Sequence, residues 1–309
     1  MGRWIVFFLA ALFTLHGDIE DHLRPVVGKS DASKMRNIDF IYMINLDGRP
    51  EKLKESLEAL KPYNIYPCRF AAVNGWELPL ETINDLGTRY ESWMENNVGW
   101  WGTYYPLDGD RTPIHEPIAH VDRIYFRHCL ALGSIGCLLS HLSVLQDAYD
   151  SGYETIWIME DDIEILQNPH LISDRIDELD ELVGKQGWDI LFTDKDTKDT
   201  AGEYVPTIYY CWRPNYAIPD SWRISQQKKI SENLRELGAR YGSYSMVLRR
   251  SGIRKILFFL KCHKLFLPYD LEYTQPANMR LFTVLDDIVS TKPQAASDNG
   301  VPNYLKENN

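Results

Sequence analysis

The chain has 309 residues, of which 44% are hydrophobic and 25% charged, as is usual for a globular protein with a sizeable core. Its 44 acidic residues outnumber its 33 lysines and arginines, and the formal net charge is -11 at pH 7. A surface of that sign repels phosphate backbones, which argues against nucleic acid as a partner.

The N-terminal segment is predicted to direct or anchor the protein. Arg3 precedes an apolar run at 4–15, whose length of about 12 residues fits a signal-peptide core better than a membrane span of roughly 20. Residues 1–17 are therefore predicted to be a signal peptide or a short hydrophobic anchor, with a helix packed on the body as the alternative. A linker follows at 18–36. The location stays open between the cytoplasmic face of a membrane and the lumen of the secretory pathway.

The next segment is predicted to begin an α/β domain that spans 37–290. A nearly continuous apolar run at 38–44 predicts a strand, and leucines at helical spacing follow the turn at 45–50. A second strand is predicted to end in R-F-A-A-V-N-G at 69–75, where the Asn-Gly pair indicates a turn. Strand, turn and helix in this order are typical of an α/β fold.

Regular periodicity fails at about 84–127, where aromatic residues, Gly and Pro are frequent, and this segment is predicted to be an insertion or lid. A helix is predicted at 133–149 and a strand at 155–159. The later predicted elements are a helix at 172–183, a strand at 188–192, a loop at 193–202, a strand at 244–248, a helix at 251–260 and a disordered tail at 291–309. This alternation predicts a mostly parallel central sheet with ligands at the carboxyl ends of its strands.

Three adjacent carboxylates, Glu160, Asp161 and Asp162, follow the apolar strand at 155–159 directly. Adjacent carboxylates repel one another and are stable together if they are solvated or bound to a cation. Mg²⁺ and Mn²⁺ prefer oxygen ligands and share them with substrate phosphates. The triplet therefore predicts a metal site, with a solvated acidic turn as the alternative.

The five cysteines form no C-x-x-C pair, and their odd number and spacing show no clustering with the eight histidines. This pattern argues against a structural zinc site. Most of the cysteines are expected to be buried thiols that act as small hydrophobic residues.

Two linked motifs resemble the signatures of glycosyltransferase family 25, which includes lipooligosaccharide-biosynthesis and procollagen-galactosyltransferase proteins. The segment G-S-I-G-C-L-L-S-H-L at 133–142 resembles the helical motif of that family, and I-M-E-D-D at 158–162 resembles the end of its next strand. Further segments agree in order: I-N-L-D-G-R-P at 44–50, A-A-V-N-G at 71–75, G-S-Y-S at 242–245 and S-G at 251–252. Together the matches span about 38–290.

The resemblance implies a GT-A-like, Rossmann-type nucleotide-sugar-binding domain that inverts the configuration of the transferred sugar. It implies a UDP-sugar donor with Mn²⁺ or Mg²⁺, transfer of a hexose such as galactose or glucose, and a glycan, lipooligosaccharide or glycoprotein acceptor. A catalytically inactive GT-A-like module that binds a nucleotide or glycan is the alternative. A glycoside hydrolase would instead need two opposed carboxylates at a defined separation.

Several polar residues are candidates for donor binding. Asn45 and Arg49 lie just beyond the first predicted strand, where an amide can contact a nucleobase and a guanidinium a diphosphate. Ser140 and His141 are expected to help position the donor, although a histidine beside an apolar helix face often belongs to the core. Glu160 and Asp161 complete the predicted donor-binding set, and Asp162 joins them as a metal ligand.

Inversion requires a carboxylate that takes the proton of the acceptor hydroxyl. Asp270 in L-P-Y-D-L-E at 267–272 is the first candidate, because the segment resembles a late P-x-D motif of the family, and Glu272 is the second. The pair Asp286 and Asp287 is a weaker candidate. The D-x-D sequence at 194–196 is expected to be a solvated loop.

The acceptor is predicted to contact the irregular segment at 84–127. Flat aromatic side chains can stack on the apolar face of a sugar ring, and Trp100 and Trp101 lie in this segment. Packing of both side chains in a core is the alternative.

Overall fold

The computed structural model describes residues 17–94, 100–109, 111–205, 212–295 and 297–300. The predicted signal peptide or anchor lies outside the described residues except for Gly17, as does the end of the predicted tail. Among the described residues, no helix has both the length and the apolar character needed to cross a bilayer.

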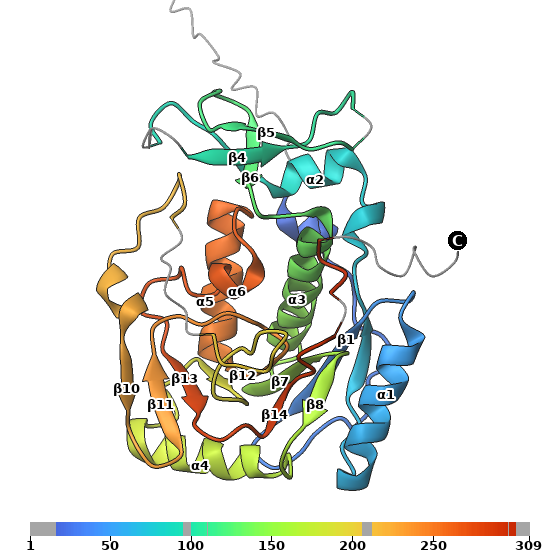
Figure 1. The fold of residues 1–309 in the computed structure, drawn as a ribbon, viewed down its shortest axis with the longest axis vertical. Coiled ribbons are helices and arrows are strands. Elements are labelled where there is room, and N and C mark those ends of the chain that lie inside the picture. The colour runs from blue at the N-terminus through green and yellow to red at the C-terminus, as the bar shows by residue number, and fades with distance from the viewer. Residues whose placement is uncertain (1–16, 95–99, 110, 206–211, 296, 301–309) are drawn as a thin grey trace, which may run out of the picture.

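Most of the described chain forms an α/β body, shown in Figure 1. The central sheet contains β1 (Phe40–Asn45), β2 (Cys68–Ala71), β7 (Thr155–Glu160), β9 (Ile190–Phe192), β10 (Gln227–Lys229), β11 (Leu234–Leu237), β12 (Ser245–Arg249) and β13 (Leu281–Val284). The α-helices are α1 (Pro50–Leu60), α2 (Leu80–Leu86), α3 (Leu132–Asp150), α4 (Leu171–Val183), α5 (Arg250–His263) and α6 (Tyr269–Glu272). The short 3₁₀ helices are η1 (Ile19–His22), η2 (Lys61–Tyr63), η3 (Gly75–Glu77) and η4 (Ser221–Ser225).

The central sheet is mixed, with the strand order β10-β11-β13-β9-β12-β7-β1-β2. Six of its strands run the same way, but β12 and β11 are reversed, so that three of the seven neighbouring pairs are parallel. The prediction of a mostly parallel sheet is corrected in this respect. The connection from β9 to β12 is the long segment at 193–244, whose described residues contain no α-helix. This connection lets β12 enter antiparallel between β7 and β9.

Helices cover both faces of the sheet because the side chains of its inner strands alternate between two cores. In β1, Phe40 and Tyr42 pack with residues of α3 and α5, whereas Ile41 and Met43 face the opposite core with α4. All of these strand residues are buried, which explains the continuous apolar run in the sequence.

Strand direction brings polar residues together at one edge of the sheet. The parallel strands β1 and β7 end there with Asn45 and Glu160. The reversed strand β12 begins at the same edge, because Ser245 pairs with Met159 in the register. Ser243 therefore lies next to the end of β7, although 83 residues separate it from Glu160.

The segment at 84–127 carries regular structure that its sequence does not reveal. Its strands β3 (Thr88–Arg89), β4 (Trp101–Tyr104), β5 (Ile114–Pro117) and β6 (Ile124–Arg127) form a second sheet with the order β3-β6-β4-β5. This small sheet lies beyond one end of α5 and α6 in Figure 1, and its buried Tyr125 shares a core with Phe266. Strands of two to four residues are too short to show a period of two.

A third pairing joins β8 (Ile163–Ile165) to β14 (Val289–Thr291) just after the carboxylate triplet. The Lys292 amide donates to the backbone oxygen of Asp162 at 3.0 Å. The hydroxyl of Thr291 donates to the Asp162 side chain at 3.4 Å. This pairing fixes the backbone on the far side of the triplet.

Candidate active site

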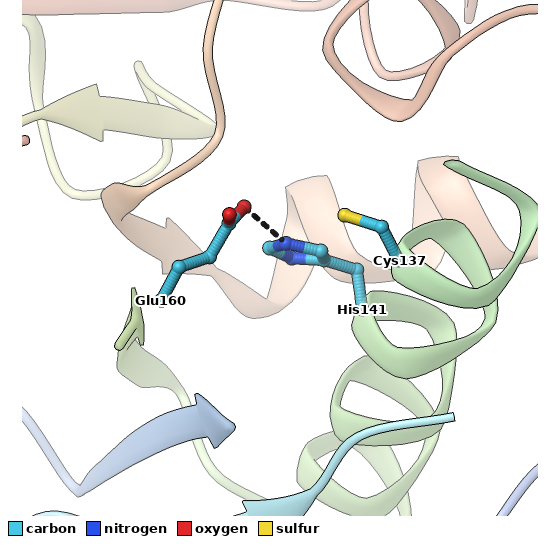
Figure 2. Close-up of side chains that lie close together, drawn as sticks. All are labelled: Cys137, His141 and Glu160. Carbon is cyan, nitrogen blue, oxygen red and sulfur yellow. Dashed lines mark hydrogen bonds and ion pairs between the residues drawn. The ribbon is translucent and has the colours of Figure 1, made fainter. Parts of the chain in front are cut away.

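Glu160 is the centre of a hydrogen-bonded cluster at the end of β7. Its Oε1 lies 3.0 Å from Nε2 of His141, and the hydroxyl of Ser243 donates to the same oxygen at 2.9 Å. The His141 side chain is fully buried and its ring stacks on Tyr269, with centroids 4.2 Å apart. The predicted helix motif and the predicted strand end therefore meet in space, as Figure 2 shows for His141 and Glu160.

Cys137 lies one helical turn before His141 and points toward the same place (Figure 2). One ligand atom from each of Cys137, His141 and Glu160 lies within 4.8 Å of the other two, so the three could hold a metal ion. Burial raises the pKa of the Cys137 thiol well above its ordinary value, and the negative charge of Glu160 adds to this effect. The spacing of the cysteines along the sequence did not reveal this group. Cys129 and Cys262 are exposed, so the expected burial of most cysteines is wrong for the described part of the chain.

The three carboxylates of the triplet differ in their pKa values. Burial raises the pKa of Asp161 to about 7 and that of Asp162 to about 6, and repulsion from neighbouring carboxylates adds to both shifts. Burial is the largest single influence on Glu160 and acts to raise its pKa. The hydrogen bond and charge of His141, the Ser243 hydroxyl and the charge of Lys52 together outweigh it, and the pKa of Glu160 is lowered. A bound cation would favour ionisation of all three, and their oxygens are the ligands that Mn²⁺ and Mg²⁺ prefer.

A cleft opens beside the triplet, between α3 and the turns that follow β1 and β2. Its lining includes Asn74 and Trp76 from one of these turns, Gly133, Cys137 and Ser140 from α3, and all three carboxylates. Lys52 also lines the cleft, and its charge lowers the pKa of each carboxylate. Lys52 was not among the residues predicted from the sequence. Its position three residues after Arg49, in the first turn of α1, indicates that the two side chains lie on the same side of the helix.

The part of the chain that matches known proteins includes most of the residues that line this cleft. A sequence model described as "Glycosyltransferase family 25 (LPS biosynthesis protein)" matches residues 38–207, more than half of the chain. The chain belongs to glycosyltransferase family 25. The match includes α3 and the carboxylate triplet, whereas the candidate bases Asp270 and Glu272 lie beyond it.

Curated relatives agree with this assignment at low identity. A glycosyltransferase 25 family member from Aedes aegypti is 25% identical over 66% of this chain and 30% of its own length. The Drosophila melanogaster member is 23% identical over 64% of this chain and 29% of its own length. A human relative named "Inactive glycosyltransferase 25 family member 3" is 25% identical over 64% of this chain and 30% of its own length. The chain thus spans about a third or less of these relatives.

Arg49 does not line the open cleft of this family 25 protein. Its guanidinium is paired with Asp298, which lines the cleft instead. The Asp298 carboxylate accepts two hydrogen bonds, at 2.9 Å from Nε and at 2.7 Å from Nη2 of Arg49. The backbone oxygen of Asp298 accepts a hydrogen bond from the Trp76 indole at 3.1 Å, and Asp298 itself lines the cleft. The Asp298 carboxylate is therefore bound to the Arg49 guanidinium, which the sequence analysis predicted to contact a diphosphate.

Asn45 and Ser140 form hydrogen bonds to residues that line the cleft beside the carboxylate triplet. Asn45 is buried, and its amide donates to Asp161 at 2.6 Å, which orients one member of the triplet. The Ser140 hydroxyl donates to the Gly136 carbonyl and accepts from the Val73 amide at 2.8 Å, which fixes the turn after β2 against α3. At Gly136 an added Cβ would lie 2.4 Å from the Val73 carbonyl oxygen, so only glycine permits this contact.

The two candidate bases occupy different environments. Asp270 is partly exposed and accepts a hydrogen bond from the Gly242 amide at 3.0 Å. Burial raises its pKa, and the nearby charge of Glu160 adds to the shift. Glu272 is fully buried in an ion pair with Arg213. Its carboxylate also accepts hydrogen bonds from the backbone amides of Phe266 and Leu267, each at 2.8 Å. This placement removes Glu272 from the candidates for the base, since it cannot reach an acceptor.

The other predicted carboxylates also serve the framework. Asp194 is fully buried, pairs with Arg240 at 2.5 Å and accepts from the Tyr244 hydroxyl at 2.6 Å. Its predicted place in a solvated loop is wrong, because Arg240 follows β11 and reaches back to it. Asp287 pairs with Lys198 and accepts the Lys195 amide at 2.8 Å, so it too is committed to structure.

The Glu272→Gln variant is expected to lose about 3–5 kcal/mol of unfolding free energy, because the change leaves the guanidinium of Arg213 buried without its counter-charge. Denaturant unfolding measures the loss. Glu232→Gln removes an exposed partner of Lys229 and is the matched control, expected to change stability by less than about 1 kcal/mol. Equal stability of the two variants would contradict a structural role for Glu272.

Proposed function

We propose that the protein transfers a hexose, most simply galactose or glucose, from a UDP-sugar to a hydroxyl group of a glycan or glycoconjugate, with inversion. The observation that carries the proposal is the cleft beside the carboxylate triplet. Three carboxylates lie close together there at the end of β7, and the pKa values of Asp161 and Asp162 are raised. Such a set favours a divalent cation and, with it, a sugar diphosphate.

Glu160, Asp161 and Asp162 would hold Mn²⁺ or Mg²⁺. The cation, when bound, would neutralise the charge that develops on the diphosphate leaving group. His141 and Ser243 hold Glu160 in place, and Asn45 holds Asp161. Lys52 adds a positive charge on the same wall of the cleft, where it can meet a phosphate.

Asp270 is proposed to accept the proton of the acceptor hydroxyl. The acceptor oxygen forms a bond to the anomeric carbon from the face opposite to the diphosphate, and the bond between that carbon and the diphosphate oxygen breaks. UDP leaves with the electron pair, and the proton passes to the Asp270 carboxylate. The raised pKa of Asp270 makes it a better proton acceptor than an ordinary aspartate.

A donor screen tests the proposal. Purified protein with Mn²⁺ is mixed with UDP-galactose, UDP-glucose or UDP-N-acetylglucosamine and a panel of neutral and acidic glycan acceptors, and UDP release is measured. We expect release with one hexose donor, loss of release in EDTA and its recovery with excess Mn²⁺. UDP release that does not change in EDTA would contradict the metal role. Hydrolysis of a glycan in the absence of any nucleotide sugar would indicate a hydrolase.

A binding module without turnover is the second candidate function, favoured by the human relative that is named inactive. Calorimetry separates it from the transferase. A catalytically inactive module would bind UDP in the presence of Mn²⁺ and release no UDP from any donor.

The Asp298→Asn variant is expected to bind UDP several-fold more tightly than the wild type in the presence of Mn²⁺. A diphosphate that contacts Arg49 must displace the Asp298 carboxylate, and the neutral amide holds Arg49 less strongly. Glu51→Gln is the matched control, because Glu51 contacts Arg49 at only 3.4 Å and is mostly exposed. Weaker UDP binding in Asp298→Asn would show instead that Asp298 belongs to the donor site.

A further inference from the structure

The small sheet forms a second cleft of about 460 Å³, within the range of roughly 300–1,000 Å³ of small-molecule sites. It is lined by Trp100, Trp101, His115, Arg127 and His128. Among the described residues that line it none is acidic, although the whole chain carries a net charge of -11. The lining combines aromatic faces with a guanidinium and two imidazoles.

Arg127 is held in place by aromatic packing, with no counter-charge from the residues that the structure describes. Its guanidinium lies 4.7 Å from the centroid of the Trp100 ring, and Trp100 packs on Trp212 with centroids 4.2 Å apart. Within the described part of the chain, no carboxylate lies within salt-bridge distance of Arg127. Arg123, just before the same strand, pairs with Glu116 at 2.5 Å. A stacked guanidinium without a carboxylate is a preorganised donor for an anion.

The two tryptophans have different roles in this arrangement. Trp100 supports Arg127 and packs against Trp212, whereas Trp101 is 50% exposed at the cleft. A flat, exposed indole can stack on the apolar face of a sugar ring. His115 is oriented by the Thr103 hydroxyl, 2.9 Å from its Nδ1, and offers further hydrogen bonding to a polar ligand.

The cleft lies close to the proposed base. The Arg127 amide donates to the Phe266 carbonyl at 2.8 Å, and Phe266 lies four residues before Asp270. The chain continues from Arg127 through Cys129 into α3. The Cys129 residue is exposed, but its thiol is partly buried. This burial raises the pKa of the thiol, and the charge of Asp270 adds to the shift.

We propose that this cleft binds an acidic sugar residue of the acceptor, with Arg127 contacting its carboxylate or phosphate and Trp101 stacking on its ring. The inference rests on the proposed transferase function, because it assigns the acceptor side of the same site. It specifies an anionic acceptor, whereas the family relationship leaves the acceptor undefined.

Binding of three probes to the full-length protein tests the inference, and the measurement does not depend on catalysis. The probes are a hyaluronan tetrasaccharide, its carboxyl-reduced neutral form and a maltotetraose 6-phosphate, each titrated by calorimetry. We expect an acidic probe to bind about tenfold or more tightly than the neutral one, as charge-assisted hydrogen bonds to a guanidinium allow. A preference for the first or the third probe identifies the anion as carboxylate or phosphate.

Arg127→Gln is expected to abolish the preference for the acidic probe while UDP affinity in Mn²⁺ is unchanged. Arg254→Gln is the matched control, because Arg254 is exposed on α5 and should leave both affinities unchanged. Equal binding of acidic and neutral probes, no binding of either acidic probe, or the same loss in Arg254→Gln would overturn the inference. Acidic binding without UDP release in the donor screen would leave the inference standing and contradict the transferase function alone.

Discussion

Asp162→Asn is expected to lower kcat/KM about 100-fold or more, as is found when a group that supports a catalytic metal or a developing charge is removed. The change replaces one anionic ligand at the end of β7 and deletes no packing contact, since Asp162 is partly exposed at the cleft. Transfer assays across a Mn²⁺ titration measure the effect. A loss that excess Mn²⁺ partly restores would locate the defect in metal affinity.

The same substitution is expected to leave the metal-free protein at least as stable as the wild type at pH 7. The pKa of Asp162 rises on folding to about 6 from an ordinary 3.8, so the native state holds its proton more tightly than the unfolded chain. Its contribution therefore becomes less favourable as pH rises from about 4 to 6, and the asparagine removes this cost. Thermal unfolding in EDTA at pH 4 and pH 7 measures the difference.

Glu164→Gln is the matched control for Asp162→Asn, because Glu164 lies two residues further on, in β8. We expect it to retain activity within about twofold. Activity of Asp162→Asn within twofold of the wild type would contradict the metal role of the triplet, and unfolding of Asp162→Asn in EDTA would show that the carboxylate stabilises the fold instead.

Asp270→Asn is expected to lower kcat by about 10²-fold or more, the usual effect of losing a general base. The asparagine can still accept the hydrogen bond from the Gly242 amide, so the loop should keep its conformation. UDP affinity measured by calorimetry in Mn²⁺ should stay nearly unchanged, because the donor side of the cleft is intact. In the wild type, kcat should rise with pH through a pKa above the ordinary value of aspartate, and the variant should lack this rise.

Each other outcome reassigns Asp270. A loss of UDP affinity would place Asp270 in the donor or metal site. An unchanged kcat would pass the role to another carboxylate, and Asp286, which is exposed after β13, is the next to substitute. Glu272 is not a replacement, because its ion pair with Arg213 is fully buried.

The sequence by itself predicted the parts of the site that depend on local pattern. The helix predicted at 133–149 corresponds to α3, and the strand predicted at 155–159 corresponds to β7, because apolar periodicity reports directly on burial within one element. The three carboxylates were identified from their adjacency alone. The contact of Glu160 with His141 was not predicted and is seen only in the folded chain.

The tertiary structure alone decided which polar residues face the cleft and which are committed to other partners. Glu272 and Arg213 are 59 residues apart, and Arg49 and Asp298 are 249 residues apart. Nothing in the local sequence distinguishes a carboxylate that will be buried in such a pair from one that will meet a ligand. The distinction depends on strand order and direction, such as the reversed β12 that brings Ser243 to Glu160. Long-range pairing therefore sets the chemistry of this site, because burial and partners determine whether a charged group is available.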